Sequence, residues 1–454
     1  MFRRVLVANR GEIALRVIRA CHDLGVEAVA IYSTADRTGS WVAAADRAVC
    51  VGPPSASESY LKIPSVIAAA ITTGCDAVHP GYGFLSENPV FVRACFDNDI
   101  AFVGPSPESM ETLGDKSSAK DAMGAAGLPL VPGSPGRLSS ASEASRVAEA
   151  AGYPVLLKAA AGGGGRGMRL VAHADELEGL FDTASAEAGA AFGDAGLYLE
   201  KAVVDAHHVE VQVLGDGRGG ALVLGDRECS VQRRHQKLME EGPSPFLSAE
   251  TRARMHQAAL EAVRATRYLN AGTIEFLVGH DQHFYFMEMN TRLQVEHPVT
   301  EEITSVDLVR EQFRIASGAA LLAEGVHPTQ GHAFEFRLNA EDPARGFLPS
   351  PGHLSRFRPP LGPGVRVDTH VYEGYDVPPN YDSLIAKIVV HDADRPAALA
   401  RAARALGELE VEGIATTRDL FLEMLEDAPI REGRYTTGYL AEAAPRLSTL
   451  GPGA

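Results

Sequence analysis

Polar and mostly apolar side chains alternate through MEMNTRLQVE, residues 287 to 296. Alternate residues of a strand share a face, so one face would carry Glu288, Asn290, Arg292, Gln294 and Glu296. A solvated strand surface gives the same alternation, but such surfaces usually include lysine or serine, and this face has neither. The pattern therefore favours a functional surface.

A second acidic residue is expected beside this face. Glu275 lies in TIEFLV, the preceding predicted strand, and can sit next to Glu288. Two carboxylates and the amide oxygen of Asn290 are the hard ligands that Mg²⁺ prefers when it also bridges nucleotide phosphates. Without a cation the carboxylates would repel each other. These residue types predict a metal site.

The stretch KAAAGGGGRGM, residues 158 to 168, places four consecutive glycines between an apolar strand and MRLV. Gly162 and Gly167 have the spacing of a Walker loop, but Met168 and Arg169 stand where its Lys and Ser/Thr must be. The apolar flanks disfavour a plain linker. Two interpretations stay open from these residues alone: a flexible hairpin tip, or a backbone cradle for phosphate with Lys158 at the strand end.

A dense basic cluster, QRRHQK at residues 232 to 237, is unusual in an acidic protein. It is either a surface loop that balances Glu240 and Glu241 or part of a site for an anion. The consecutive residues His207 and His208 lie earlier in the chain. They would point to opposite faces of a strand, so a zinc site made by both histidines is not expected.

The order of the predicted strands and helices along the chain indicates an α/β region followed by an α+β region. Residues 4 to 32 read as strand, turn, helix and strand, a right-handed βαβ unit. Its turn, NRGE, has one glycine and lacks the dinucleotide fingerprint, so a nucleotide is not expected there. Asp115 is a predicted helix cap, and strands dominate after residue 207.

Composition excludes some partners. With 42 Lys and Arg against 59 Asp and Glu, the net charge of -17 argues against a general binder of nucleic acid or anionic membranes. Five widely spaced cysteines without a C-x-x-C pair indicate reduced thiols, and no apolar run is long enough to span a bilayer. A cytoplasmic location is expected.

The chain resembles the biotin carboxylases, a branch of the ATP-grasp superfamily. HPGYGFLSEN and EMNTRLQVEHPVTE are the most specific of the matching motifs, whereas the glycine stretch alone is not specific. The likeness covers nearly the whole chain in this order: VANRGEIA, HPGYGFLSEN, FVGP, GDK, KAAAGGGGRGM, HVEVQVL, RRHQK, EMNTRLQVEHPVTE, RLNAEDP, FLPSPG and VPPNYDSLIAK.

The resemblance implies a fold of three parts. A Rossmann-like open α/β sheet, the pre-ATP-grasp domain, is expected over residues 1–114. An ATP-grasp core is expected over 115–330, with a mobile glycine-rich lid at about 132–203. A mixed α+β domain would occupy 331–446, and a flexible tail 447–454.

The resemblance also assigns site residues. Arg337 would stabilise the enolate of biotin, and Tyr82 would lie near its ureido ring. Bicarbonate would be held by Lys237, Arg292, Gln294 and the Val295 amide, with Glu296 as the base that removes its proton. Mg²⁺ or Mn²⁺ would be held by Glu275, Glu288 and Asn290. ATP would contact Lys116, Lys158, Gly163, Gly164, Gly165, Glu200, Lys201, Val203, His208, Gln232, His235, Glu275, Leu277 and Glu288.

The implied activity is ATP-dependent carboxylation of biotin by bicarbonate through carboxyphosphate, as the first half-reaction of an acyl-CoA carboxylase of the acetyl-CoA or propionyl-CoA type. Expected partners are a biotin carboxyl carrier protein or domain, a second copy of the chain and a carboxyltransferase subunit. The M-K-M signature of a carrier domain is absent, so the biotin is expected on a separate protein, or the chain is the first part of a longer one.

Three alternatives compete with this assignment. One is another ATP-grasp ligase of bicarbonate or a carboxylate, and another is the biotin carboxylase part of a pyruvate carboxylase. The third, a non-catalytic protein that only binds nucleotide, is disfavoured because the implied catalytic residues are present. Departures from the family pattern are small: Ala161 shortens the glycine run, and His207 replaces a common arginine.

Overall fold

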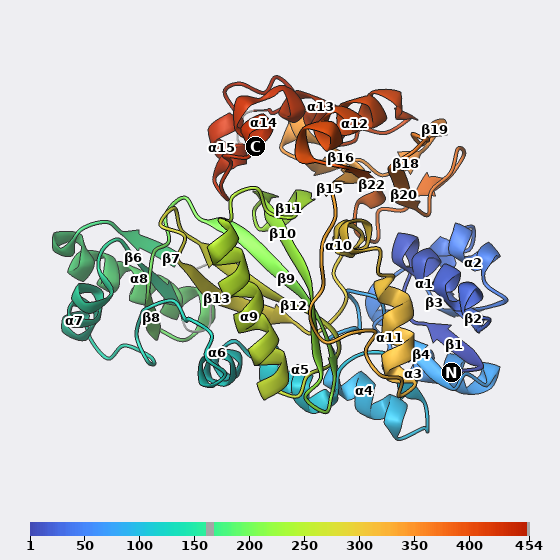
Figure 1. The fold of residues 1–454 in the computed structure, drawn as a ribbon, viewed down its shortest axis with the longest axis horizontal. Coiled ribbons are helices and arrows are strands. Elements are labelled where there is room, and N and C mark those ends of the chain that lie inside the picture. The colour runs from blue at the N-terminus through green and yellow to red at the C-terminus, as the bar shows by residue number, and fades with distance from the viewer. Residues whose placement is uncertain (160–167, 452–454) are drawn as a thin grey trace.

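The computed structural model describes residues 1–159 and 168–451. Its N-terminal region is an open parallel sheet in the order β3-β2-β1-β4-β5, drawn in blue in Figure 1. The predicted open α/β sheet is therefore confirmed. Its strands are β1 (Arg4–Val7), β2 (Glu27–Ser33), β3 (Arg47–Gly52), β4 (Ala77–His79) and β5 (Ala101–Phe102), and its helices are α1 (Gly11–Asp23), α2 (Ser40–Ala44), α3 (Ile63–Thr73), α4 (Pro89–Phe96) and α5 (Pro107–Gly114).

A nine-stranded sheet forms the centre of the molecule. Its main path runs β13-β12-β9-β10-β11-β15-β22-β20, and β14 pairs with β10. Since β11 pairs with β15, strands of the predicted core and of the predicted C-terminal domain share one sheet. The strands are β9 (His207–Asp216), β10 (Ala221–Arg233), β11 (Gln236–Gly242), β12 (Leu269–Val278), β13 (Phe284–Asn290), β14 (Gly325–Val326), β15 (His332–Asn339), β20 (Val365–Thr369) and β22 (Leu384–Asp392).

Hydrophobic cores pack against this sheet along its length. Helix α9 (Ala249–Ala265) packs its buried Met255, Leu260 and Val263 against β9 and β10. Helices α12 (Arg395–Glu408) and α13 (Arg418–Glu426) pack against β15 and β22 at the other end, at the top of Figure 1. Apolar burial on this scale is the main stabilising contribution to such a sheet. Helices α10 (His297–Thr304), α11 (Leu308–Ala316), α14 (Ala428–Glu432) and α15 (Tyr439–Ala443) also belong to this part of the chain.

A separate three-stranded sheet, β7-β6-β8, lies at the left of Figure 1 with helices α7 and α8. Strands flank the glycine stretch as predicted, because β6 pairs with β7 in antiparallel register and Lys158 lies opposite Met168. Gly163, Gly164 and Gly165 lie outside the described residues. The elements are α6 (Lys116–Ala125), α7 (Ala141–Ala151), β6 (Val155–Ala159), β7 (Met168–Val171), α8 (Leu177–Phe192) and β8 (Leu197–Lys201).

Short strands complete the C-terminal region. They are β16 (Glu341–Asp342), β17 (Leu348–Pro349), β18 (Gly352–His353), β19 (Arg356–Arg358), β21 (Asp376–Val377) and β23 (Glu410–Glu412). None of the helices in the described part of the chain combines the length and apolar character that crossing a bilayer requires.

Two sequence predictions need correction. The strand expected over 287–296 ends at Asn290, and α10 begins at His297. The backbone N–H of Thr291 donates to the Glu87 carboxylate at 3.1 Å instead of to a neighbouring strand, and Pro298 lies in the first turn of α10. The residues 291–296 between them form a turn.

The second correction concerns the tail predicted from residue 447. Leu447 is buried in the C-terminal core, and the Thr449 backbone N–H donates to Glu423 at 3.0 Å. At least these residues of the predicted tail are packed against the domain.

Candidate active site

Three buried carboxylates surround the ammonium of Lys237. Its Nζ lies 2.7 Å from Glu210, 3.2 Å from Glu275 and 2.5 Å from Glu296. Lys237 is the second residue of β11, whereas the carboxylates come from β9, β12 and the end of the 291–296 turn. Burial opposes the charge of Lys237, but the three carboxylates outweigh it and hold its pKa well above the ordinary value. We call these four residues the Lys237 cluster.

Glu296 is held between two cations. Its Oε1 accepts from Lys237, and its Oε2 accepts from Arg337 Nη2 at 3.0 Å. Burial alone would raise the pKa of Glu296, but Lys237, Arg337 and Arg227 bring it well below the ordinary value. The side chain is therefore an ionised carboxylate, which is the form a general base needs.

Arg337 bridges Glu296 to a second acidic pair. Its Nε donates to Glu240 Oε1 at 2.6 Å, and Glu240 lies directly opposite Glu335 across β11 and β15. Burial, which outweighs Arg337, raises the pKa of Glu240 to about 7. Neither carboxyl oxygen of Glu335 has a hydrogen-bond partner among the described residues, and burial raises its pKa well above the ordinary value.

The Glu240 proton gives a pH-dependent stability. The pKa of Glu240 is raised from 4.5 to about 7 in the folded protein. Its proton therefore adds to the free energy of unfolding in full below pH 4.5, and this contribution is lost as the pH rises through about 7. Glutamine mimics the protonated carboxyl at every pH, whereas the wild type loses its proton as the pH rises. The thermal midpoint of Glu240→Gln minus that of wild type should therefore increase between about pH 5 and pH 8. Calorimetry at both pH values measures this. A difference that stays constant, as expected for the exposed control Glu324→Gln, would contradict the prediction.

The residues predicted to hold a metal lie together. Glu275 pairs with Glu288 across β12 and β13, and Asn290 Nδ2 lies 2.7 Å from Glu275 Oε1. Burial and then the charge of Glu275 raise the pKa of Glu288. Lys116 Nζ approaches Glu288 only to 4.0 Å, so the charge of Glu288 is poorly compensated, whereas Glu275 has Lys237 as its partner. The uncompensated negative charge and the oxygen donors of these residues fit Mg²⁺.

The predicted bicarbonate residues converge although the strand that should carry them ends early. Gln294 Nε2 donates to Glu275 Oε1 at 2.6 Å, which joins the turn to the Lys237 cluster. Arg292 Nη2 donates to Asn290 Oδ1 at 2.9 Å, and its Nε donates to Glu87 at 2.9 Å. The 291–296 turn thus carries the side chains that were expected on one face of a strand.

Residues predicted to contact ATP fall into two groups. On β12 and the adjacent β9, His208 Nε2 lies 2.8 Å from Glu275, and Leu277 is opposite His208. In the hairpin between β10 and β11, Gln232 pairs with Lys237, and His235 is exposed at the turn. Both parts of this first group border the Lys237 cluster.

The second group lies on the small sheet. Lys158 and Lys120 both bind the carboxylate of Glu200. Burial opposes this charge, but the two ammonium groups lower the pKa of Glu200. The Nζ of Lys201 donates to the carbonyls of Gly152 and Tyr153, each at 2.7 Å, so this ammonium supports the fold here, and half-buried Val203 follows β8.

Tyr82 is positioned by the N-terminal turn. Asn9 Nδ2 donates to the carbonyls of Pro80 and Tyr82, each at 2.7 Å. Gly81 between them has φ +63°, and a Cβ there would lie 2.9 Å from Ile13. The Tyr82 hydroxyl donates to Glu12. The VANRGEIA and HPGYG motifs therefore contact each other.

Arg227 is a member of the site that sequence reasoning missed. It is fully buried, and its guanidinium donates to Glu210 at 2.7 Å and to Gln294 at 2.8 Å. It therefore ties the Lys237 cluster to the 291–296 turn. A charged residue inside the buried strand ALVLGDRECSV was the available signal.

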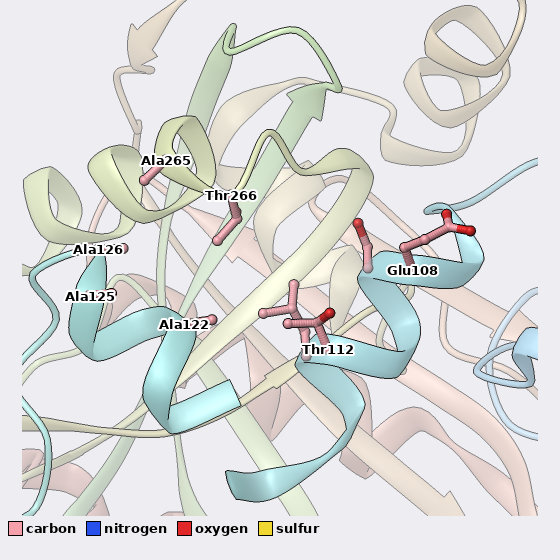
Figure 2. A pocket seen from close by; sticks show the side chains of 9 residues that line it. Glu108, Thr112, Ala122, Ala125, Ala126, Ala265 and Thr266 are labelled. Carbon is pink, nitrogen blue, oxygen red and sulfur yellow. The ribbon is translucent and has the colours of Figure 1, made fainter. Parts of the chain in front are cut away.

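A hollow elsewhere on the surface contains none of the predicted site residues. It lies between α5, α6 and the end of α9, and small side chains line much of it (Figure 2). The lining includes Ala122, Ala125, Ala126, Ala265 and Thr266. Nothing in this lining suggests catalysis.

Three family models match consecutive parts of the chain. "Biotin carboxylase, N-terminal domain" matches residues 1–110, and "Biotin carboxylase C-terminal domain" matches residues 335–442. Between them, "Carbamoyl-phosphate synthase L chain, ATP binding domain" matches residues 115–324. Together they extend over most of the chain.

Individual relatives resemble the chain over nearly its full length. A biotin carboxylase of Nostoc sp. is 51% identical over 97% of this chain and 99% of its own. A pyruvate carboxylase subunit of Methanothermobacter thermautotrophicus is 47% identical, over 97% of this chain and 90% of its own.

A solved structure shares the fold. The biotin carboxylase domain dimer of the Hydrogenobacter thermophilus 2-oxoglutarate carboxylase, in complex with MgADP, ADP and bicarbonate, is 46% identical. The match covers 98% of both chains with a TM-score of 0.88.

Proposed function

The chain belongs to the biotin carboxylase family, and we propose that it performs the first half-reaction of an acyl-CoA carboxylase, on biotin held by a carrier protein or domain. Its enzyme class is an ATP-dependent ligase that carboxylates biotin, with ATP, magnesium and biotin as the molecules it uses. The observation that carries the proposed residue roles is Glu296, an ionised carboxylate between Lys237 and Arg337.

In the proposed first step, bicarbonate binds beside the Lys237 cluster. Lys237 and Arg292 supply positive charge, while Gln294 and the Val295 amide orient the anion. Glu296 removes the proton of bicarbonate, which makes one oxygen a competent nucleophile. That oxygen attacks the γ-phosphorus of ATP, so the bond to the β-γ bridging oxygen breaks and the products are carboxyphosphate and ADP.

Glu275, Glu288 and Asn290 are the residues proposed to hold Mg²⁺. When bound, the ion neutralises charge on the phosphates during transfer. Lys116 and Lys158 would contact the phosphates, and Glu200, Lys201, Val203, His208, Gln232, His235 and Leu277 would line the nucleotide site. For Lys201 and Val203 we propose contact through the backbone, because the Lys201 ammonium already binds two carbonyls.

The second step carboxylates biotin. Carboxyphosphate breaks down to CO₂ and phosphate, and phosphate takes the ureido N1′ proton of biotin. The resulting enolate, stabilised by Arg337 beside Tyr82, attacks CO₂ and forms N1′-carboxybiotin. Water would destroy carboxyphosphate, so the proposed lid at about 132–203 serves to exclude it.

The proposed final acceptor of the carboxyl group is an acyl-CoA, with pyruvate as the second candidate. The similarity to a pyruvate carboxylase subunit is the observation that makes pyruvate the second candidate. We also propose a carboxyltransferase partner and a homodimer, since the Hydrogenobacter domain is a dimer. Five unpaired cysteines support a reducing compartment such as the cytoplasm.

Labelled bicarbonate tests the carrier and the acceptor. The chain, ATP and Mg²⁺ are incubated with a biotinylated carrier protein, and label on the carrier is measured before a co-purifying transferase is added with acetyl-CoA, propionyl-CoA or pyruvate. Label should move to an acyl-CoA. Transfer to pyruvate alone would select the second candidate, and an unlabelled carrier would contradict the biotin proposal. A carrier whose biotinyl lysine is replaced by arginine is the matched control.

A further inference from the structure

Lys387 is buried behind the proposed bicarbonate site. It lies on β22, and its side chain has no exposed area. Its Nζ donates to the Val295 carbonyl at 3.0 Å. The residues on either side of Val295 are Gln294 and Glu296, so Lys387 holds the middle of the turn that supplies the proposed bicarbonate contacts.

The same ammonium is paired with the N-terminal region. Lys387 Nζ lies 3.1 Å from Glu12 Oε1 and 3.9 Å from Asp368. Glu12 in turn accepts from the Tyr82 hydroxyl, and the Lys387 ammonium lies 6.0 Å from the centre of the Tyr82 ring. The Lys387–Glu12 pair therefore joins the proposed bicarbonate turn to the proposed ureido contact.

This pair is poorly explained as a stabilising element alone. Removing two charges from water has a desolvation penalty that often equals or exceeds their attraction, and apolar residues of similar volume usually serve stability as well. The Glu12 Oε2 atom, moreover, is buried and lacks a hydrogen-bond partner among the described residues. The pair does, however, fix a backbone carbonyl that belongs to the site, at a point where three regions of the chain meet.

We propose that Lys387, with Glu12 as its counter-ion, is a positioning residue for bicarbonate. It fixes the 291–296 turn through the Val295 carbonyl and links that turn to Tyr82. The inference rests on the proposed function. Lys387 does not touch the reacting atoms, so it acts through the geometry of Gln294, Val295 and Glu296. Loss of the ammonium would let this turn shift while the nucleotide site on β12 and β6 stays intact.

The test separates positioning from charge balance. Lys387→Met leaves Glu12 buried without its cation, so Lys387→Met/Glu12→Gln is made as well, in which both charges are gone. Bicarbonate and ATP are titrated separately in an ADP-release assay, and thermal midpoints are measured. Lys387→Met should raise the bicarbonate KM about 10-fold or more while the ATP KM changes less than about twofold.

In the double variant the thermal midpoint should return toward wild type while the bicarbonate KM stays raised. A double variant with wild-type stability and a wild-type bicarbonate KM would overturn the inference, because a balancing role alone would then suffice. If Lys387→Met does not fold, the double variant still decides. Failure of the proposed function would look different: wild-type protein itself would show no bicarbonate-dependent ADP release.

Discussion

Glu296→Gln is expected to remove bicarbonate-dependent ADP release almost completely, by about 100- to 10,000-fold, the range that general bases contribute. The amide keeps the size of the side chain but cannot accept the proton of bicarbonate. It also cancels the charge that pairs with Lys237 and Arg337. ATP affinity should stay within about threefold, because the proposed nucleotide contacts lie on other elements.

The assay compares steady-state ADP release with nucleotide binding by calorimetry. Glu302→Gln is the matched control, since Glu302 lies on α10 a short distance along the chain and outside the Lys237 cluster. That control should retain wild-type rates. Full activity of Glu296→Gln, or equal loss in both variants, would contradict the role of Glu296 as the base.

Arg337→Gln should separate the two steps of the reaction. If Arg337 stabilises the biotin enolate, stimulation of ADP release by biotin should fall about 100- to 1,000-fold, the usual effect of removing one oxyanion donor. Bicarbonate-dependent ATP cleavage without biotin should survive within about fivefold, because Lys237 still holds Glu296. Glu240, left without its cation, can take up a proton, since its pKa is already about 7.

Product analysis completes this comparison. Carboxybiotin and ADP are measured in the same reaction, and the ratio of ADP to carboxybiotin should rise in Arg337→Gln as the activated carbonate is lost to water. Arg358→Gln, at an exposed position on β19, is the control. Parallel loss of both activities, with the ratio unchanged, would place Arg337 in the first step instead.

Local rules were enough for much of the fold. The βαβ unit at the N-terminus follows from its periodicity, and Asp115 caps α6 by accepting from the Ser118 N–H at 2.9 Å, as its position predicts. The pairing of Glu275 with Glu288 also follows from two adjacent strands. In each case the residues are close in sequence or share a simple hairpin.

Long-range contacts explain where sequence reasoning stopped. Glu87, from the N-terminal region, binds Thr291 and Arg292 and so ends the strand that alternation predicts through Glu296. Lys387 and Val295 are 92 residues apart in the chain, and the sequence around either residue does not predict their contact. Arg227 reaches its partners from inside an apolar strand, where its charge was visible but its direction was not.

The most direct test of the account is ADP release by the wild-type chain with ATP and Mg²⁺, measured with and without bicarbonate and with and without free biotin. We expect release to require bicarbonate and to increase when biotin is added, with carboxybiotin formed. Bicarbonate-dependent release that biotin leaves unchanged, with no carboxybiotin formed, would contradict the central claim and point to another ATP-grasp ligase.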